Sequence, residues 1–395
     1  MAEIQWPLVH TLVSELEAAS ISYMLVEESA LWAQGVEGIL PAKLTIEIQW
    51  DQFPDARDLF TKYDPREDEG KGWSSLSFTL DGVSVEILCR YNTVIVTNID
   101  RWSVVHDGRK LYAKSFDFYR REWGPDDPRT AKITTFLRNL QREHSRINEE
   151  AWNQSTYDAW VHRYGTPATA AAWIKKDPEA RLSPLNEYLG DLKGKKAVNL
   201  LGSHGAKGVA MALLGADAAV MDISRENAAY ALDVAREAGV ELKYVVSDVL
   251  DLPAEELSGE YDVVLMELGI LHYFIDLLPL GVVVRELLKP GGRFVLHDFH
   301  PISTKLITSK GKKHKVTGNY FESGFEEADV AYSKHFPDNR ELKKVRHRKW
   351  TLGEIVTAFA QAGLVIRVLS EEPNTKVDDI GLPKTFTMVA EKAGK

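Results

Sequence analysis

The stretch KAVNLLGSHGAKGVAMALLGADAAVMDIS, residues 196–224, decides the fold of the C-terminal part of the chain. It begins with an apolar run at 197–201, passes through a glycine-containing turn into an apolar helical stretch at 209–214, and ends in a second apolar run at 218–221. Two apolar runs of strand length with a helix between them are typical of a β–α–β unit with parallel strands. The stretch therefore predicts a parallel sheet with helices on both faces.

The same alternation continues to the end of the chain. Helical stretches follow at 226–238, 280–288 and 351–362. Because the last two strand-like runs come after five strand–helix units, we expect them to form a hairpin at one edge. The prediction is an α/β fold with a doubly wound, mostly parallel seven-stranded sheet, Rossmann-like. Its seven strand-like runs are 197–201, 218–221, 243–246, 263–266, 293–297, 364–371 and 385–391.

The 395 residues are enough for two domains that each bury a core. We place a smaller α+β domain at 1–147, with strand-like runs mixed among helical stretches. An aromatic-rich connector at 148–195, divided by prolines into short helices, precedes the α/β domain at 196–395.

Charge and cysteine content exclude several classes of function. With 48 Lys and Arg against 58 Asp and Glu, the formal net charge is −10, which disfavours long-range attraction to nucleic acid or anionic lipid. Cys89 is the single cysteine, so we expect neither an intrachain disulfide nor a cysteine-based metal site. No apolar run has the length of a membrane span, and the first residues lack a secretory signal. We expect a cytoplasmic protein with no membrane partner.

Acidic residues at the ends of the second and third predicted strands indicate what the sheet binds. The glycine-containing turn alone is a weak signal, because it also suits a dinucleotide or a simple tight turn. Asp222 lies 20 residues beyond Gly202, where a carboxylate can accept hydrogen bonds from both hydroxyls of a ribose. A dehydrogenase could use the same device. Asp248, at the end of the third strand, can accept from an adenine amino group, and the dinucleotide pattern has no such residue.

Further motifs follow in a fixed order, and with them residues 196–393 resemble the class I methyltransferases. The resemblance implies that S-adenosylmethionine is the cofactor, that the first turn lies against its methionine part, and that Asp222 and Asp248 hold the ribose and the adenine. The motifs are DIS at 222–224, SD at 247–248, DLP at 251–253, YDVV at 261–264 and LKPGGR at 288–293. The cofactor-binding residues expected from it are Tyr157, Trp160, Asn199, Leu201, Gly202, Ser203, Gly205, Asp222, Ile223, Ser224, Asp248, Val249 and Glu267.

Two departures from the family pattern concern the methionine end. The family usually has an acidic residue where this chain has Asn199, and its glycines usually follow the spacing GxGxG. The side-chain carbonyl of Asn199 can still accept a hydrogen bond from the ammonium of the cofactor, without supplying a charge.

Candidates for the chemistry follow the fourth and fifth strands. Methyl transfer is an in-line displacement at a sulfonium, and it usually needs a group that accepts the proton of the nucleophile. We predict His300 as base or substrate contact, His272 as the next candidate, and Glu267 as a cofactor or substrate contact. The alternative is that these are polar residues with satisfied hydrogen bonds at strand ends. No metal site is expected.

The connector and the N-terminal domain have less specific features. Tyr157 and Trp160 are one helical turn apart, and the connector resembles the cap helix of small-molecule methyltransferases, although packing of a linker helix explains the pair as well. Residues 20–140 faintly resemble the minimal nucleotidyltransferase fold. Glu28-Ser29 replaces its glycine pair, and Thr45 with Glu47 replaces its carboxylate pair. We predict an inactive copy used for substrate recognition or to form a homodimer.

The leading hypothesis is a methyltransferase for O, N or C of a small molecule. The alternatives are an RNA methyltransferase whose N-terminal domain holds the RNA, and a non-catalytic protein that senses the cofactor. The acidic balance disfavours RNA. No motif identifies the accepting atom.

Overall fold

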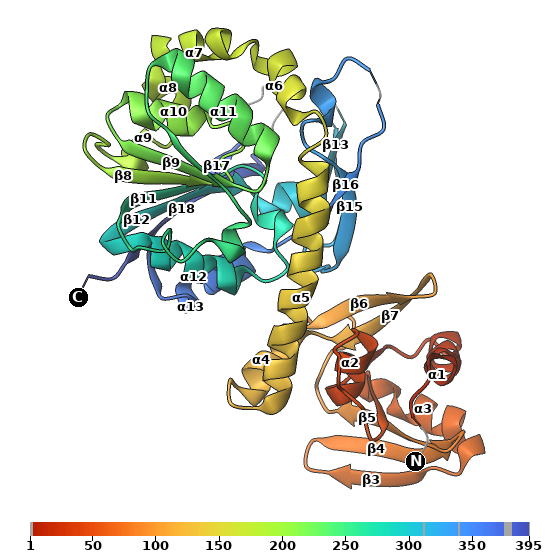
Figure 1. The fold of residues 1–395 in the computed structure, drawn as a ribbon. Coiled ribbons are helices and arrows are strands. Elements are labelled where there is room, and N and C mark those ends of the chain that lie inside the picture. Colours follow the sequence, from red (N-terminus) through yellow and green to blue (C-terminus); the bar gives the residue numbers. More distant parts are fainter. Residues whose placement is uncertain (1–2, 311–312, 339, 375–380, 395) are drawn as a thin grey trace. The chain divides into compact units, whose positions relative to one another are not determined.

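The computed structural model describes residues 3–310, 313–338, 340–374 and 381–394 (Figure 1). It divides into two compact units. The N-terminal unit comprises residues 1–139 with 321–324, and the C-terminal unit comprises residues 140–320 with 325–395. None of the described helices is long and apolar enough to cross a membrane.

The N-terminal unit contains a seven-stranded sheet with the order β3-β4-β5-β2-β1-β7-β6. The pairs β2–β5 and β1–β7 are parallel and the others antiparallel. The strands are β1 (Tyr23–Leu25), β2 (Leu44–Ile48), β3 (Arg66–Gly70), β4 (Trp73–Leu80), β5 (Val83–Arg90), β6 (Arg101–His106) and β7 (Arg109–Lys114). The helices are α1 (Trp6–Ala18), α2 (Glu27–Ala33), α3 (Phe53–Phe60) and α4 (Phe116–Trp123).

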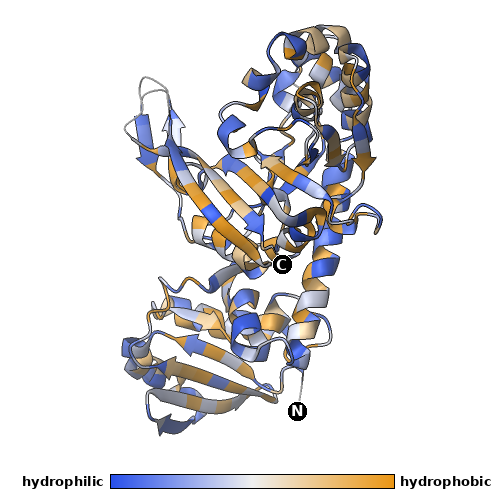
Figure 2. Ribbon diagram, turned by 90° about the vertical axis from the view of Figure 1, so that its left-hand side faces the viewer, coloured by the Kyte–Doolittle hydropathy of each residue, from blue (hydrophilic) through white to orange (hydrophobic). Residues whose placement is uncertain are grey.

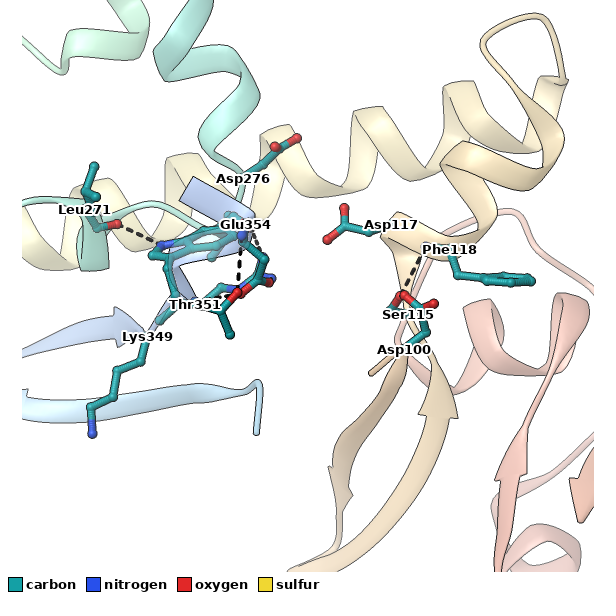
Figure 3. A network of polar contacts seen from close by, with 12 residues as sticks. Asp100, Ser115, Asp117, Phe118, Leu271, Asp276, Lys349, Thr351 and Glu354 are labelled. Carbon is teal, nitrogen blue, oxygen red and sulfur yellow. Dashed lines mark hydrogen bonds and ion pairs between the residues drawn. The ribbon is translucent and has the colours of Figure 1, made fainter. Parts of the chain in front are cut away.

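Ser115 shows how side chains define helix ends in this unit. Its hydroxyl oxygen accepts a hydrogen bond from the Phe118 N–H at 3.1 Å and donates one to Asp100 Oδ1 at 2.9 Å (Figure 3). This is the N-cap arrangement that satisfies an otherwise free backbone donor, and it fixes the first residue of α4.

The C-terminal unit contains the predicted sheet, with the order β10-β9-β8-β11-β12-β18-β17. Pairing is parallel from β10 to β12 and antiparallel for β12–β18 and β18–β17. The doubly wound, mostly parallel α/β prediction and its edge hairpin are thus confirmed. The strands are β8 (Lys196–Leu200), β9 (Asp217–Asp222), β10 (Lys243–Val246), β11 (Tyr261–Glu267), β12 (Leu288–Phe299), β17 (Leu364–Pro373) and β18 (Pro383–Lys392).

Helices cover both faces of this sheet because its central strands β8, β9 and β11 are mostly apolar and buried (Figure 2). One face packs against α10 (Ala206–Leu213) and α11 (Arg225–Ala238), and the other against α12 (Leu277–Leu287) and α13 (Leu352–Gln361). The short helices of the connector pack in the same core as α10 and α11. They are α6 (Thr156–Tyr164), α7 (Pro167–Lys176), α8 (Pro178–Leu182) and α9 (Asn186–Leu189).

An insertion between β12 and α13 adds two hairpins to the C-terminal unit. They are formed by β13 (Ile307–Lys310) with β14 (Lys313–Val316) and by β15 (Phe325–Asp329) with β16 (Lys344–Arg348). After β16 the indole N–H of Trp350 donates to the Leu271 carbonyl at 3.0 Å, and Thr351 with Glu354 forms a capping box that begins α13 (Figure 3).

The division between the units falls inside one helix, α5 (Pro128–Ala151), whereas the sequence placed a boundary after residue 147. From Leu140 onward α5 belongs to the C-terminal unit. There the Gln141 side chain accepts from the Ile275 N–H at 2.9 Å, and Asn148 accepts from the Arg346 N–H at 2.8 Å. An unbroken polar helix carries no change of composition that marks such a division.

Candidate active site

A cavity of about 610 Å³ lies at the carboxyl ends of the parallel strands of the C-terminal unit. This is the edge at which doubly wound sheets bind ligands. Ten residues predicted to act at the site line the cavity: Trp160, Leu201, Gly202, Ser203, Asp222, Ile223, Asp248, Val249, Glu267 and His272. Five others, Tyr157, Asn199, Gly205, Ser224 and His300, are not among its lining residues.

The first turn has the left-handed backbone conformation that usually requires glycine, although most of its residues carry side chains. Leu201, Ser203 and Gly205 have φ values of 50°, 48° and 73°. Three alternate positions therefore lie in the left-handed region, and only the last of them is a glycine. This reproduces the GxGxG spacing in conformation although the sequence departs from it. The neighbouring Gly202 is needed for packing, because a Cβ there would lie 2.6 Å from Asn199 Oδ1.

Asp222 ends β9 with its carboxylate at the cavity. Its Oδ1 accepts from the Ser224 N–H at 2.9 Å and from Asn227 Nδ2 at 3.1 Å, and its Oδ2 accepts from the Ser203 N–H at 3.1 Å. Burial raises the pKa of Asp222, and these hydrogen bonds oppose that rise. A carboxylate offers about four acceptor sites, so one remains, on Oδ2. The structure leaves room for one ribose hydroxyl on this carboxylate, where the sequence indicated two.

The third strand end supplies a polar group beside apolar ones. Asp248 Oδ1 accepts from the Leu250 N–H at 2.9 Å and so begins the 3-10 helix η3 (Val249–Asp251). The Ser247 N–H donates to the Asp222 carbonyl at 3.0 Å, which joins the ends of β9 and β10. Asp248, the buried Val249 and Ile223 thus surround the part of the cavity where a purine ring can pack against apolar atoms.

Asn199 lies below the floor of the cavity. It is 1% exposed, and its Nδ2 donates to the Leu265 carbonyl at 3.2 Å. Its Oδ1 is buried with no hydrogen-bond partner among the described residues and lies under Gly202. A direct contact of Asn199 with the cofactor stays a prediction, and the structure does not bring its side chain to the cavity wall.

Glu267, at the end of β11, forms an ion pair that the sequence did not indicate. Its Oε2 lies 3.2 Å from the Lys207 ammonium, and both side chains line the cavity. Burial raises the pKa of Glu267, and Lys207 counteracts this rise. The pair is the sole described Lys/Arg-to-carboxylate bridge with both members in the wall of this cavity.

His272 is the predicted base candidate that the structure places at the cavity. Burial lowers its pKa to about 3, and its Nε2 has no hydrogen-bond partner in the described parts of the chain. Its ring centroid lies 3.9 Å from that of His347 on β16. His272 is therefore neutral at physiological pH, with a ring nitrogen still able to form a hydrogen bond.

His300 occupies a different environment. Its Nε2 lies 2.7 Å from Glu371 Oε1, and its Nδ1 accepts from the Ile302 N–H at 3.1 Å. Both ring nitrogens are engaged, and the contact with Glu371 joins the segment that follows β12 to the edge strand β17, across the intervening β18. The reason is the alternation of side chains along a strand, which directs Phe299 to the cavity and His300 away from it.

The remaining predicted residues stabilise the cap and the first two turns. Tyr157 donates to Asp233 Oδ2 at 2.8 Å and faces α11, whereas Trp160 lines the cavity and donates to Asn227 Oδ1 at 2.8 Å. Ser224 caps α11. Gly205 is needed for packing, because a Cβ there would lie 2.5 Å from the Cβ of Ala231.

Several cavity residues carry no sequence signal. They come from the C-terminal half of α5, from the connector, from the first turn and from the insertion. His204 stacks on Tyr164 at 4.6 Å, and its pKa is lowered by burial to about 4. Only the cap-helix resemblance pointed toward this wall. Its members include Gln141, Ser145, Trp152, Tyr164, Trp173, Arg181, His204, Lys334 and His335.

Comparison with known proteins agrees with this geometry. Residues 201–296 match a family model described as a methyltransferase domain. A 136-residue segment, 32% of this chain, is 29% identical to a ubiquinone biosynthesis O-methyltransferase of Bordetella avium. The match spans 55% of that relative, so the chain covers about half of its length.

Two solved structures are also similar. An S-adenosylmethionine-dependent methyltransferase of Mesorhizobium loti has 20% identity and a TM-score of 0.42, over 56% of this chain and 99% of that one. The magnesium protoporphyrin IX methyltransferase of Synechocystis, with bound S-adenosylhomocysteine, has 16% identity and a TM-score of 0.40, over 63% and 100%.

Sheet order, cavity position and family match define one class. The C-terminal half of the chain is a class I S-adenosylmethionine-dependent methyltransferase domain, as the sequence predicted. The cofactor of this class is S-adenosylmethionine.

In the N-terminal unit, basic side chains lie against Glu47 and Glu86 on the parallel strands β2 and β5. The buried Glu47 accepts from Arg90 Nη1 at 2.8 Å, and Glu86 is paired with the Lys43 ammonium. The backbone N–H of Thr45 donates a hydrogen bond to the hydroxyl oxygen of Ser29 at 2.9 Å. Within the described ranges no three His, Cys, Asp or Glu side chains are grouped so that they could hold a metal ion.

Proposed function

We propose that this chain transfers a methyl group from S-adenosylmethionine to O, N or C of a small molecule by in-line displacement. The observation that carries the proposal is that Asp222 at the end of β9 and Asp248, two residues beyond the neighbouring β10, line one cavity together with the first turn. When bound, the cofactor supplies an electrophilic methyl group on a sulfonium. The remaining acceptor site of Asp222 suits a ribose hydroxyl, and Asp248 with Val249 and Ile223 suits an adenine.

A small acceptor is supported by the size and the lining of the cavity. Its volume of about 610 Å³ lies within the range of small-molecule sites, roughly 300–1,000 Å³, which are mostly lined by apolar and aromatic groups. Here Trp152, Trp160, Tyr164 and Phe299 supply such a lining. The name of the Bordetella relative, an O-methyltransferase of ubiquinone biosynthesis, is consistent with a small acceptor.

His272 is our candidate for the group that orients the acceptor through a hydrogen bond, because an imidazole with a pKa of about 3 accepts a hydrogen bond but retains a proton poorly. The neutral imidazole lies in the wall of the cavity, beside Phe299 and near Gly269. The ring is buried beside Tyr273 and His347, and such surroundings of low polarity strengthen a hydrogen bond from the acceptor to it. Alignment with the sulfonium would supply the larger part of the rate enhancement, because the displacement depends mainly on proximity and orientation.

Cofactor binding is tested by thermal unfolding of the full chain with S-adenosylhomocysteine. At a ligand concentration about 100 times Kd the stabilisation is about 2.7 kcal/mol, which raises the Tm of a domain of this size by about 5–10 °C. Asp222→Ala should abolish the shift. Asp217→Ala, at the exposed other end of β9, is the matched control and should leave it unchanged. An unchanged shift in Asp222→Ala would show that the ribose assignment is wrong.

Transfer itself is tested with S-adenosylmethionine labelled in its methyl group. Incubation with a fraction of small metabolites should yield labelled product, and incubation with RNA should not. Label in the RNA would favour the RNA methyltransferase hypothesis instead. Binding without transfer to either fraction would favour a cofactor sensor.

We also propose that the N-terminal unit is a catalytically inactive nucleotidyltransferase-like domain. Arg90 and Lys43 neutralise the carboxylates of Glu47 and Glu86, which would otherwise bind Mg²⁺. Thr45 does not supply a third carboxylate. A calorimetric titration with ATP and MgCl₂ should give no heat of binding. Saturable binding that requires Mg²⁺ would contradict this.

A further inference from the structure

The ion pair of Lys207 and Glu267 gives the cavity two opposite charges beside the first turn. Glu267 ends β11, and Lys207 lies in the first turn of α10. Their side chains are 17% and 22% exposed, and the Nζ–Oε2 distance is 3.2 Å. Two charges in the wall of an aromatic cavity lose much of their hydration, so such a pair is expensive unless it serves a ligand.

The position of Lys207 favours an anion at the start of α10. The positive end of a helix dipole lies at its N-terminus, where acidic side chains are normally favoured. The first turn of α10 contains no acidic residue and carries a lysine instead. Helix dipole and ammonium therefore have the same sign here, and a carboxylate placed against them would be stabilised by both.

Glu267 supplies the negative charge that the neutral Asn199 does not. In the register of the parallel pair, Leu265 of β11 is opposite Asn199 of β8. Glu267 is two residues further along β11, on the same face and nearer the carboxyl edge, and it lines the cavity. Asn199 is neutral and donates back to β11, so the negative charge at this end of the cavity comes from Glu267.

We propose that Glu267 and Lys207 form a clamp for the amino-acid part of the cofactor, in which Glu267 binds the α-ammonium and Lys207 the α-carboxylate. This rests on the proposed function. Before binding the two side chains neutralise each other, and on binding each exchanges its partner for the opposite charge of the ligand. No net charge is buried at any stage, which keeps the cost of desolvation low. The family's acidic residue is thus replaced by one from the adjacent strand.

The clamp is tested by isothermal titration calorimetry of the full chain with two ligands. S-adenosylhomocysteine carries the amino-acid part, and methylthioadenosine has the same thioether and nucleoside without it. We expect the wild type to bind S-adenosylhomocysteine at least ~30-fold more tightly, since each charge-assisted hydrogen bond contributes about a factor of 10–100. Lys207→Met and Glu267→Gln should each weaken S-adenosylhomocysteine by about 10–100-fold and methylthioadenosine by less than about threefold.

Lys196→Met is the matched control, because it breaks the exposed pair with Glu260, at 2.6 Å, at the other end of β8. It should change neither affinity. Equal binding of both ligands by the wild type would overturn the clamp and leave the proposed function intact. Binding of neither would overturn both. Equal losses for the two ligands in Lys207→Met would show that the pair maintains the fold only. If one variant does not fold, the other variant and the ratio of the two ligand affinities in the wild type still test the clamp.

Discussion

Ser203→Gly should stabilise the methyltransferase domain, although it removes a hydroxyl and introduces the most flexible residue. Ser203 has φ of 48°, a conformation that costs a residue with a Cβ about 1–2 kcal/mol. Its Oγ is buried without a hydrogen-bond partner among the described residues, and a glycine removes that desolvated group. The backbone N–H of residue 203, which donates to Asp222, is kept.

The magnitude follows from three contributions. Relief of the left-handed conformation contributes about 1–2 kcal/mol. Removal of a buried hydroxyl without a partner contributes about 1 kcal/mol. The greater freedom of glycine in the unfolded chain takes back about 0.5–1 kcal/mol. The net gain is about 1–2 kcal/mol, which for a domain of about 200 residues corresponds to about 3–6 °C in Tm.

Gly205→Ala, in the same turn, should have the opposite sign. Its φ of 73° disfavours any Cβ, and the new methyl group would lie 2.5 Å from the Cβ of Ala231. Left-handed strain and overpacking together predict a loss of about 2–5 kcal/mol.

Differential scanning calorimetry measures both variants. The transition that moves when S-adenosylhomocysteine is added belongs to the methyltransferase domain, so its Tm can be followed separately from that of the N-terminal unit. A lower Tm for Ser203→Gly would refute the reasoning, because it would mean that the hydroxyl or the Cβ stabilises the turn. A Gly205→Ala variant as stable as the wild type would refute the packing argument.

Three further predictions concern the histidines and the cap. The pKa of His272 falls from 6.5 to about 3 on folding, so below pH 6.5 the unfolded chain binds a proton that the folded chain does not. The free energy of unfolding should therefore fall as the pH is lowered from 6.5, by up to about 1.4 kcal/mol per pH unit. When this free energy is measured by urea unfolding at several pH values, it should depend less steeply on pH in His272→Gln than in the wild type. His300→Gln should lower the free energy of unfolding by about 1–2 kcal/mol, because the contact with Glu371 is lost. The affinity for S-adenosylhomocysteine, measured by calorimetry, should stay within about twofold of the wild type. A loss of affinity without a loss of stability would show that His300 belongs to the binding site. Trp160→Phe should cost about 1–3 kcal/mol in thermal unfolding, since it leaves the buried Asn227 Oδ1 without its donor, and a cost no larger than that of Tyr164→Phe would contradict this role.

The sheet and its cofactor edge could be predicted from sequence because both depend on local patterns. Apolar runs separated by helices specify parallel strands, and the one or two residues that follow such a run lie at the carboxyl edge wherever the run is placed. Asp222 and Asp248 satisfy this rule, and both reach the cavity.

Residues beyond the strand ends could not be assigned in this way. Whether His300 or Phe299 faces the cavity depends on the register of β12 with β18, which no local pattern records. The left-handed conformation of Leu201 and Ser203 was hidden because glycine is its usual signal and both positions carry side chains. Lys207 reads as an ordinary helix residue until the neighbouring strand brings Glu267 within 3.2 Å.

The cavity residues come partly from inside and partly from outside the range that matches the family model, and this division indicates which of them select the acceptor. The family match covers 201–296, which contains Asp222, Asp248, Glu267 and His272. The wall that would face an acceptor comes largely from outside it, from residues 141–181 and from the insertion that carries Lys334 and His335. Family likeness therefore indicates the cofactor and leaves the acceptor open, since the side chains that select it lie on segments the family model does not describe. Replacing the cavity-lining side chains of those two segments, with Trp160 and the sheet left unchanged, should alter the acceptor and preserve the affinity for S-adenosylhomocysteine.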